Sequence, residues 1–129
     1  MRTLVVGFLF ASVLLLAVGC SREAALKRRV TDVGAYKLRS EVLAVCRDGF
    51  AAGVAQKIPE ERWPASVRPF EPASLWAEPD GAYILIDSDA DGERGVFLPR
   101  IDPEKDPICT PKLTHVKLAS GVYTYDRKR

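Results

Sequence analysis

The stretch SLWAEPDGAYILIDSDADGERGVFLP, residues 74–99, decides the fold of this chain. It contains three β-rich runs, at 75–77, 82–86 and 95–98. Pro79-Asp80-Gly81 is a strong turn signal between the first two runs, and the polar residues 87–92 separate the second run from the third. Because short connections join antiparallel neighbours, the stretch predicts three successive strands of an antiparallel sheet.

Two further alternating segments follow towards the C-terminus. Residues 113–118 and 122–125 alternate apolar with polar side chains, and Ser120-Gly121 separates them. This period of two is typical of half-buried strands. The sequence therefore predicts one or two more strands, which gives a sheet of four to five.

Upstream of the strands, residues 34–57 carry apolar side chains every three or four positions: Leu38, Val42, Val45, Cys46, Phe50 and Val54. This spacing predicts an amphipathic helix. Gly49 and Gly53 lower its helix propensity, and their small size would let a sheet pack closely. The expected fold is α+β, with one long N-terminal amphipathic helix packed on a four- to five-stranded antiparallel sheet.

Between the helix and the strands, residues 58–74 hold four prolines and cannot form a long helix or a central strand. Large apolar side chains recur among these prolines. We expect Trp63, Val67 and Phe70 to fix this loop onto the core. The alternative is an exposed aromatic docking face made of Trp63, Phe70 and Trp76.

The first twenty residues, MRTLVVGFLFASVLLLAVGC, have the pattern of an export signal. Arg2 is followed by an uncharged segment, 3–19, whose apolar part is short for a membrane-spanning helix. Leu16-Ala17-Val18-Gly19-Cys20 resembles the lipobox of bacterial lipoproteins. The resemblance implies cleavage after Gly19, a diacylglycerol thioether on Cys20 and acylation of the new N-terminus. Two or three acyl chains make a stable membrane anchor.

This resemblance divides the chain into a signal peptide (1–19), a lipidated tether (20–32) and a single small α+β domain (33–129). Ser21 after the lipid-bearing cysteine resembles lipoproteins sorted to the outer membrane, so we expect the domain to face the periplasm there. The tether is charged and weakly helical. Its cations are expected to form a solvated run or, alternatively, to lie against anionic headgroups: Arg22, Lys27, Arg28 and Arg29.

With Cys20 assigned to lipid, two cysteines remain, Cys46 and Cys109. An exported protein meets an oxidising compartment, so an even remainder of two predicts one disulfide. The alternative is a reactive thiol at Cys109 with His115, the one histidine of the chain, as its base. Two cysteines and one histidine lack the clustered spacing of a zinc site.

One short motif resembles a metal loop. Asp87-Ser88-Asp89-Ala90-Asp91-Gly92 matches the start of a calcium-binding loop, with oxygens at alternate positions followed by glycine. The twelfth loop position, which needs a bidentate glutamate, is Leu98, and a strand follows instead of a helix. We therefore expect a solvated hairpin loop and no cofactor, with weak calcium binding by Asp87, Asp89 and Asp91 as the alternative.

The composition and the lack of known catalytic motifs limit the classes of function that the sequence supports. The net charge of +2 lacks the basic excess of nucleic-acid-binding proteins. The chain has no nucleophile elbow and no phosphate-binding glycine loop, so no catalytic residues are assigned. The sequence predicts a non-enzymatic binding or accessory module of the cell envelope, held to the membrane by its lipid and able to engage an envelope protein.

An inhibitor of a wall-active enzyme is the alternative function. Ser120-Gly121-Val122-Tyr123 is similar to the Ser-Gly-x-x-Tyr signature of the membrane-bound inhibitors of c-type lysozyme. It has one residue fewer between glycine and tyrosine, and the second signature of that family, ending Thr-Lys-Gly, is absent. No residue role is carried over from this resemblance.

Overall fold

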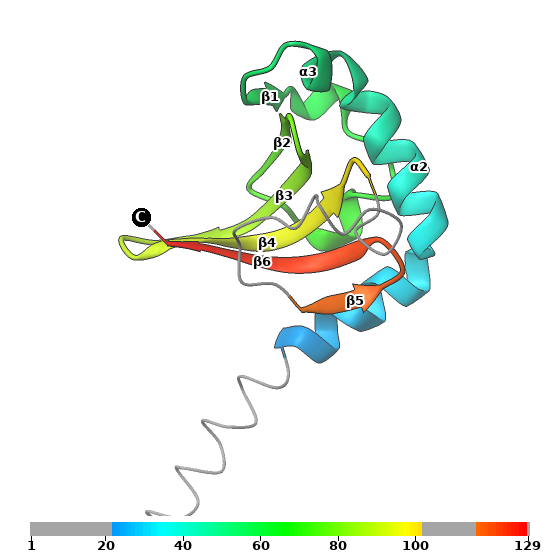
Figure 1. Cartoon of the computed structure of the whole chain (residues 1–129). Helices are drawn as coiled ribbons and strands as arrows, with labels where there is room; N and C mark the ends of the chain where they lie inside the picture. Colours follow the sequence, from blue (N-terminus) through cyan, green and yellow to red (C-terminus); the bar gives the residue numbers. More distant parts are fainter. Residues whose placement is uncertain (1–21, 102–115, 129) are drawn as a thin grey trace, which may run out of the picture.

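A single antiparallel sheet organises the computed structural model, which describes residues 22–101 and 116–128 (Figure 1). Six strands pair in the order β1-β2-β3-β4-β6-β5. Their bounds are Gln56–Ile58 (β1), Ser74–Glu78 (β2), Gly81–Ser88 (β3), Gly92–Pro99 (β4), Lys117–Ala119 (β5) and Val122–Lys128 (β6). The α+β class and the antiparallel pairing are confirmed, whereas the expected count of four to five strands is wrong.

The strand that the sequence missed is β1. It forms the edge of the sheet, where Ile58 pairs with Leu75 of β2. The sequence pattern puts Gln56 and Lys57 at the end of the expected helix and Ile58 in the proline-rich loop. Three residues with one buried side chain, Ile58, are too short to show an alternating pattern.

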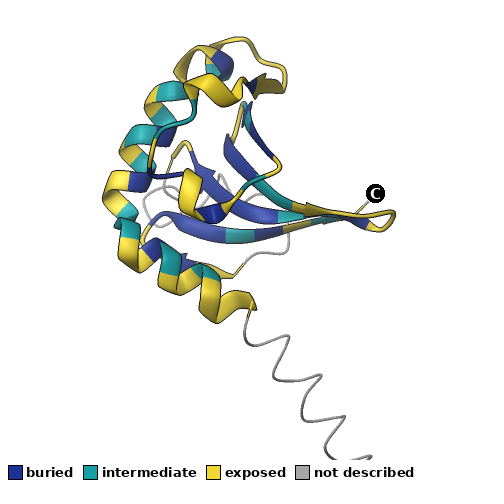
Figure 2. Ribbon diagram, turned by 180° about the vertical axis from the view of Figure 1, so that it is seen from behind, coloured by how far each residue is buried: buried dark blue, intermediate teal, exposed yellow. Residues whose placement is uncertain are grey.

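A helical arm crosses the strands on one side of the sheet (Figures 1 and 2). It consists of residues 22–33, α2 (Ala35–Val45) and α3 (Arg47–Ala51). The expected start of the helix at residue 34 is confirmed by α2, whereas its continuation to residue 57 is wrong, because the helix is divided at Cys46 and α3 ends at Ala51. Gly34 has a φ of 93°, which breaks the regular helix, and Gly53 has a φ of 71° just after α3. Such left-handed backbone favours glycine and ends or bends a helix.

The main core lies between the helical arm and the facing side of the sheet. Its fully buried side chains include Leu38 and Val42 from α2 and Leu75, Ile84, Val96 and Leu98 from the strands. Val30, inside the segment expected to be a tether, is only 1% exposed and belongs to this core. The folded part of the chain therefore includes residues N-terminal to 33.

The proline-rich loop packs onto the same core. Two short 3-10 turns, η1 (Glu60–Arg62) and η2 (Arg68–Phe70), shape it. Val67 and Phe70 are fully buried in the core and Trp63 packs against it, which confirms that these side chains fix the loop. The alternative aromatic docking face is wrong, because the Phe70 side chain has no exposed surface.

Arg39 ties the helical arm to the sheet. Its guanidinium donates hydrogen bonds to the carbonyl oxygens of Pro99, at 3.0 Å, and Gly121, at 2.7 Å. These two carbonyls lie at the end of β4 and in the turn between β5 and β6. A charged donor to a part-buried carbonyl is among the stronger hydrogen bonds, so this contact fixes α2 over the end of the sheet.

Gly49 allows α3 to lie directly on β2. A Cβ at Gly49 would sit 2.5 Å from the Cβ of Ala77, whereas nothing lies within 4 Å at Gly53. The close approach expected at both glycines is thus confirmed at Gly49 and wrong at Gly53.

Replacing Gly49 with alanine should lower the free energy of unfolding by about 1–2 kcal/mol. The clash with Ala77 outweighs the gain in helix propensity of roughly 1 kcal/mol, because overpacking costs about 1–3 kcal/mol. Urea denaturation followed by circular dichroism measures the change. Ala52→Val, at an exposed site, is the control and should stay within about 0.5 kcal/mol of the wild type. A stabilised Gly49→Ala protein would contradict the close packing.

The side of the sheet away from the helical arm carries a second, aromatic cluster. Tyr83, Phe97 and Tyr125 are buried there, and the Tyr83 ring centroid lies 4.7 Å from that of Phe97 and 5.0 Å from that of Tyr125. The guanidinium of Arg127 sits 4.6 Å above the Tyr83 ring and pairs with Glu78 at 2.9 Å. These residues alternate along their strands with the core residues, so both faces of the sheet are apolar at its centre.

Candidate functional site

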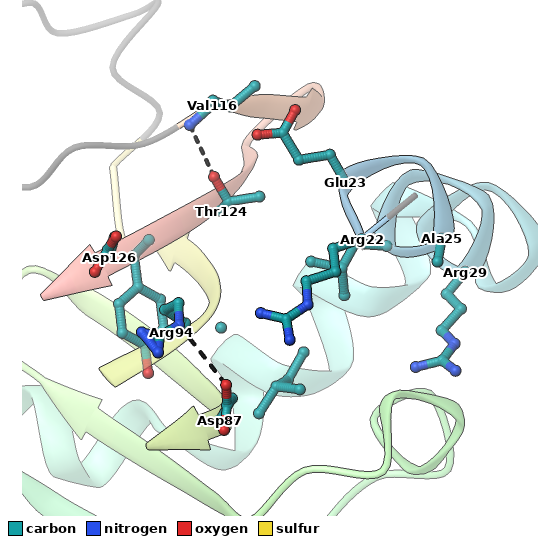
Figure 3. Close-up of a pocket in the computed structure, with 13 residues that line it drawn as sticks. Arg22, Glu23, Ala25, Arg29, Asp87, Arg94, Val116, Thr124 and Asp126 are labelled. Carbon is teal, nitrogen blue, oxygen red and sulfur yellow. Dashed lines mark hydrogen bonds and ion pairs between the residues drawn. The ribbon is translucent and has the colours of Figure 1, made fainter. Parts of the chain in front are cut away.

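A cavity of about 640 Å³ lies between the start of the helical arm and one end of the sheet (Figure 3). Its helix side is formed by Arg22, Glu23, Ala25, Leu26 and Arg29. Its sheet side includes Ile86, Asp87, Arg94, Val116 and Asp126. The volume falls in the range of small-molecule sites, and apolar side chains are mixed with charged ones, as such sites require.

The helix side of the cavity arises from regular spacing in residues 22–33. Arg22, Ala25, Leu26 and Arg29 are separated by three or four positions, which places them on one helix face. Lys27 and Arg28 project from other faces and do not line the cavity. The sequence interpretation treated these cations as one run. The helical spacing of Arg22 and Arg29 was the signal that could have distinguished these two arginines from the cations on the other faces.

On the sheet side, an irregularity in β3 shapes the cavity wall. Leu85 pairs with Gly95 and Asp87 pairs with Arg94, so the register shifts between Leu85 and Asp87. A bulge of this kind redirects side chains and often lies beside functional sites. Here Ile86 and Asp87 both line the cavity.

Arg94 is neutralised within the sheet wall. Its guanidinium forms an ion pair with Asp89 and lies 3.7 Å from a carboxylate oxygen of Asp87. The pair with Asp87 faces Arg22 across the cavity in Figure 3. By contrast, among the described residues no ion pair or hydrogen bond engages the guanidinium of Arg22 or Arg29.

The predicted acidic loop forms the turn between β3 and β4. One carboxylate oxygen of Asp89 accepts hydrogen bonds from the backbone N–H groups of Asp91, at 2.8 Å, and Gly92, at 3.1 Å. The hydrogen bond from Asp91, followed by the ion pair with Arg94, lowers the pKa of Asp89. Asp87 shares the same arginine, so two of the three carboxylates already have a cation. Within residues 22–101 and 116–128, no cluster of three potential metal-ligating side chains occurs.

We predict that millimolar calcium leaves the melting temperature of the protein unchanged. A cation at Asp87, Asp89 and Asp91 would have to displace Arg94 and break the turn hydrogen bonds of Asp89. Differential scanning fluorimetry with and without calcium measures the effect, because a tightly bound ion would stabilise the fold by several kcal/mol at saturation. A rise in melting temperature that Asp89→Asn abolishes, and that Asp48→Asn preserves, would establish a calcium site.

Cys46 lies at the junction of α2 and α3, with its side chain fully buried. Burial raises the pKa of its thiol to about 11, although Arg62 acts in the opposite direction. A free Cys46 would therefore be protonated at neutral pH and unsuited to nucleophilic chemistry. Its predicted partner Cys109 and the candidate base His115 lie outside the described residues, so the disulfide stays a prediction.

A second cavity, of about 580 Å³, lies on the helical arm beside the end of β4. Leu43, Arg47 and Phe50 line it together with Arg100, whose guanidinium lies 5.9 Å from the Phe50 ring centroid. Both arginines are exposed, and no carboxylate lines this cavity. It has less chemical variety than the first cavity, which remains the candidate site.

No protein-family model matches the chain, and no curated protein or solved structure matches it. Among residues 22–101 and 116–128, no helix combines the length and the apolar character needed to cross a membrane. The predicted signal segment and Cys20 lie outside these residues.

Proposed function

We propose that the chain is an exported bacterial lipoprotein, anchored through Cys20, whose folded part is a non-enzymatic binding module of the cell envelope. Its ligand occupies the cavity beside the start of the helical arm. One observation carries the proposal: Arg22 and Glu23, two and three residues after the predicted lipid-bearing cysteine, line this cavity.

The short distance along the chain between Cys20 and the cavity supports a site at the membrane. Two residues of extended chain span at most about 7 Å, so an acylated Cys20 keeps Arg22 within the headgroup layer. The cavity would then open beside the bilayer surface. Ser21 after the anchor supports the outer membrane as the location.

Several side chains in the cavity have protein partners and leave the two cations of the helix wall for a ligand. Arg94 is paired with Asp87 and Asp89, and the Thr124 hydroxyl oxygen accepts a hydrogen bond from the N–H of Val116 at 2.9 Å. These groups are held in place by protein partners. The cations left for a ligand are those of Arg22 and Arg29, which attract anionic groups but cannot accept a proton.

Photo-crosslinking in intact bacteria tests this proposal. Val116 and Val54 are both exposed valines, at 45% and 62%, but only Val116 lines the cavity. A p-benzoylphenylalanine in place of Val116 should give an adduct, measured as added intact mass, whereas the same residue in place of Val54 should give none. Introducing Cys20→Ala should remove the adduct, because the domain then leaves the membrane. Equal labelling at both positions, or no adduct at 116, would refute the proposed site.

The alternative function, inhibition of a wall-active enzyme, stays a prediction that the described residues do not favour. It relied on Ser120-Gly121-Val122-Tyr123, which forms the turn and the start of β6. Gly121, Val122 and Tyr123 are buried, and the Gly121 carbonyl is held by Arg39. A segment that enters the active site of a partner has to project from the surface, and this one does not.

A further inference from the structure

Both walls of the cavity beside the anchor carry charged side chains. Arg22, Arg29 and Glu23 come from the helical arm. Asp126 comes from β6, where it pairs in register with Arg94 of β4. Arg94 and Asp87 largely cancel each other, because they form an ion pair. A ligand therefore meets a surplus of positive charge on the helix wall, from Arg22 and Arg29, and a surplus of negative charge on the sheet wall, from Asp87 and Asp126 (Figure 3).

Apolar side chains lie between these charges. Ala25 and Leu26 project from the helical arm, and Ile86 and Val116 from the sheet side. Val116 is one of the few large apolar side chains exposed among the described residues. The cavity thus offers contact to a hydrocarbon chain as well as to two opposite charges.

The ligand that matches this arrangement is a zwitterionic amphiphile. Guanidinium groups bind phosphate through paired hydrogen bonds, and a carboxylate binds a primary ammonium through charge-assisted hydrogen bonds. We infer that the cavity holds one ethanolamine phospholipid, with its phosphate at Arg22 and Arg29, its ammonium at Asp126 and the start of an acyl chain along Leu26 and Val116.

Location favours a membrane lipid over a soluble ligand, and here the inference rests on the proposed anchorage. A domain tethered within a few ångströms of the bilayer meets phospholipid at a very high effective concentration. Among phospholipid headgroups, ethanolamine is the one that suits the carboxylate of Asp126. A quaternary choline has no N–H to donate to Asp126, and a glycerol headgroup leaves the lipid with a net negative charge.

Isothermal titration calorimetry tests the inference on the full exported protein, extracted in a non-ionic detergent. The probes are dihexanoyl phosphatidylethanolamine, phosphatidylglycerol and phosphatidylcholine. We expect the ethanolamine lipid to bind about tenfold more tightly than either of the others. Arg22→Gln and Asp126→Asn should each weaken its binding by about tenfold. Asp126→Asn should leave the affinity for phosphatidylglycerol unchanged, because that lipid has no ammonium.

Two matched variants control for nonspecific charge effects. Arg28→Gln removes an exposed cation from the same helix outside the cavity, and Asp48→Asn removes an exposed carboxylate from α3. Both should bind the ethanolamine lipid within twofold of the wild type. Equal affinity for all three lipids, or ethanolamine binding that survives Asp126→Asn, would overturn the inference. A protein adduct at position 116 without lipid binding would overturn it too, but would leave the proposed binding function intact.

Discussion

Replacing Phe97 with alanine is expected to lower the free energy of unfolding by about 3–5 kcal/mol. Phe97 is 1% exposed and belongs to the aromatic cluster on the sheet face opposite the helical arm, where its ring contacts that of Tyr83. On β4 it pairs directly with Tyr83 of β3 and with Tyr123 of β6. Removal of its ring therefore leaves a cavity among the aromatic side chains of these three strands. Urea denaturation followed by tryptophan fluorescence and circular dichroism measures the loss.

Tyr36 provides the matched control for Phe97. It is also aromatic but lies on α2 with 87% of its side chain exposed, so Tyr36→Ala should change the stability by less than about 0.5 kcal/mol. If Phe97→Ala were as harmless as Tyr36→Ala, the second sheet face would not contribute to the core, and the aromatic cluster would have no role in stability.

The second large effect concerns the predicted disulfide between Cys46 and Cys109. Cys109→Ala should lower the free energy of unfolding by about 2–5 kcal/mol, since the bridge closes a long loop and restricts the unfolded chain. The double variant with Cys46→Ala should cost little more than the larger of the two single ones, because both remove the same bond.

Thiol titration decides whether the bridge exists, provided that the protein is unfolded first. A buried Cys46 thiol with a pKa of about 11 would escape the reagent in the native state even if it were free. In denaturant without reductant, the bridged protein should show no thiol, and reduction should release two. Two thiols before reduction would eliminate the disulfide and restore Cys109 with His115 as a candidate reactive pair.

Much of the sheet was predictable because its signals are local. The turn residues Pro79 and Asp80 and the alternating runs around Ile84 and Val96 define β2, β3 and β4 without reference to the rest of the chain. Strand β1 was not predictable in this way. Its three residues are too few to show an alternation of apolar and polar side chains. The strand forms because Ile58 packs into a core made by segments distant in the sequence.

The helical arm shows the same limit. The apolar spacing around Leu38 and Val42 predicts α2 correctly, but the bend at Gly34 depends on the backbone, and glycine occurs in many settings. Val30 enters the core only because this bend returns the preceding helix to the sheet. A charged segment with one buried valine has no pattern that distinguishes it from a tether.

The candidate site was the least predictable part. Its two walls come from residues about sixty to one hundred positions apart, and neither wall forms a motif by itself. The motif that did stand out, Asp87 to Gly92, is explained by turn geometry and by Arg94. Cavity residues such as Arg22 and Asp126 become related only when the arm folds over the end of the sheet.

The central claim is that this domain acts from a lipid anchor at Cys20, with its cavity at the membrane surface. Intact mass spectrometry of the wild-type protein, extracted from bacterial membranes, tests it most directly. We expect a chain that starts at Cys20 and carries a diacylglycerol thioether and an N-terminal acyl group. A mature protein that retains Met1, or one that starts at Cys20 without acyl chains, would contradict it.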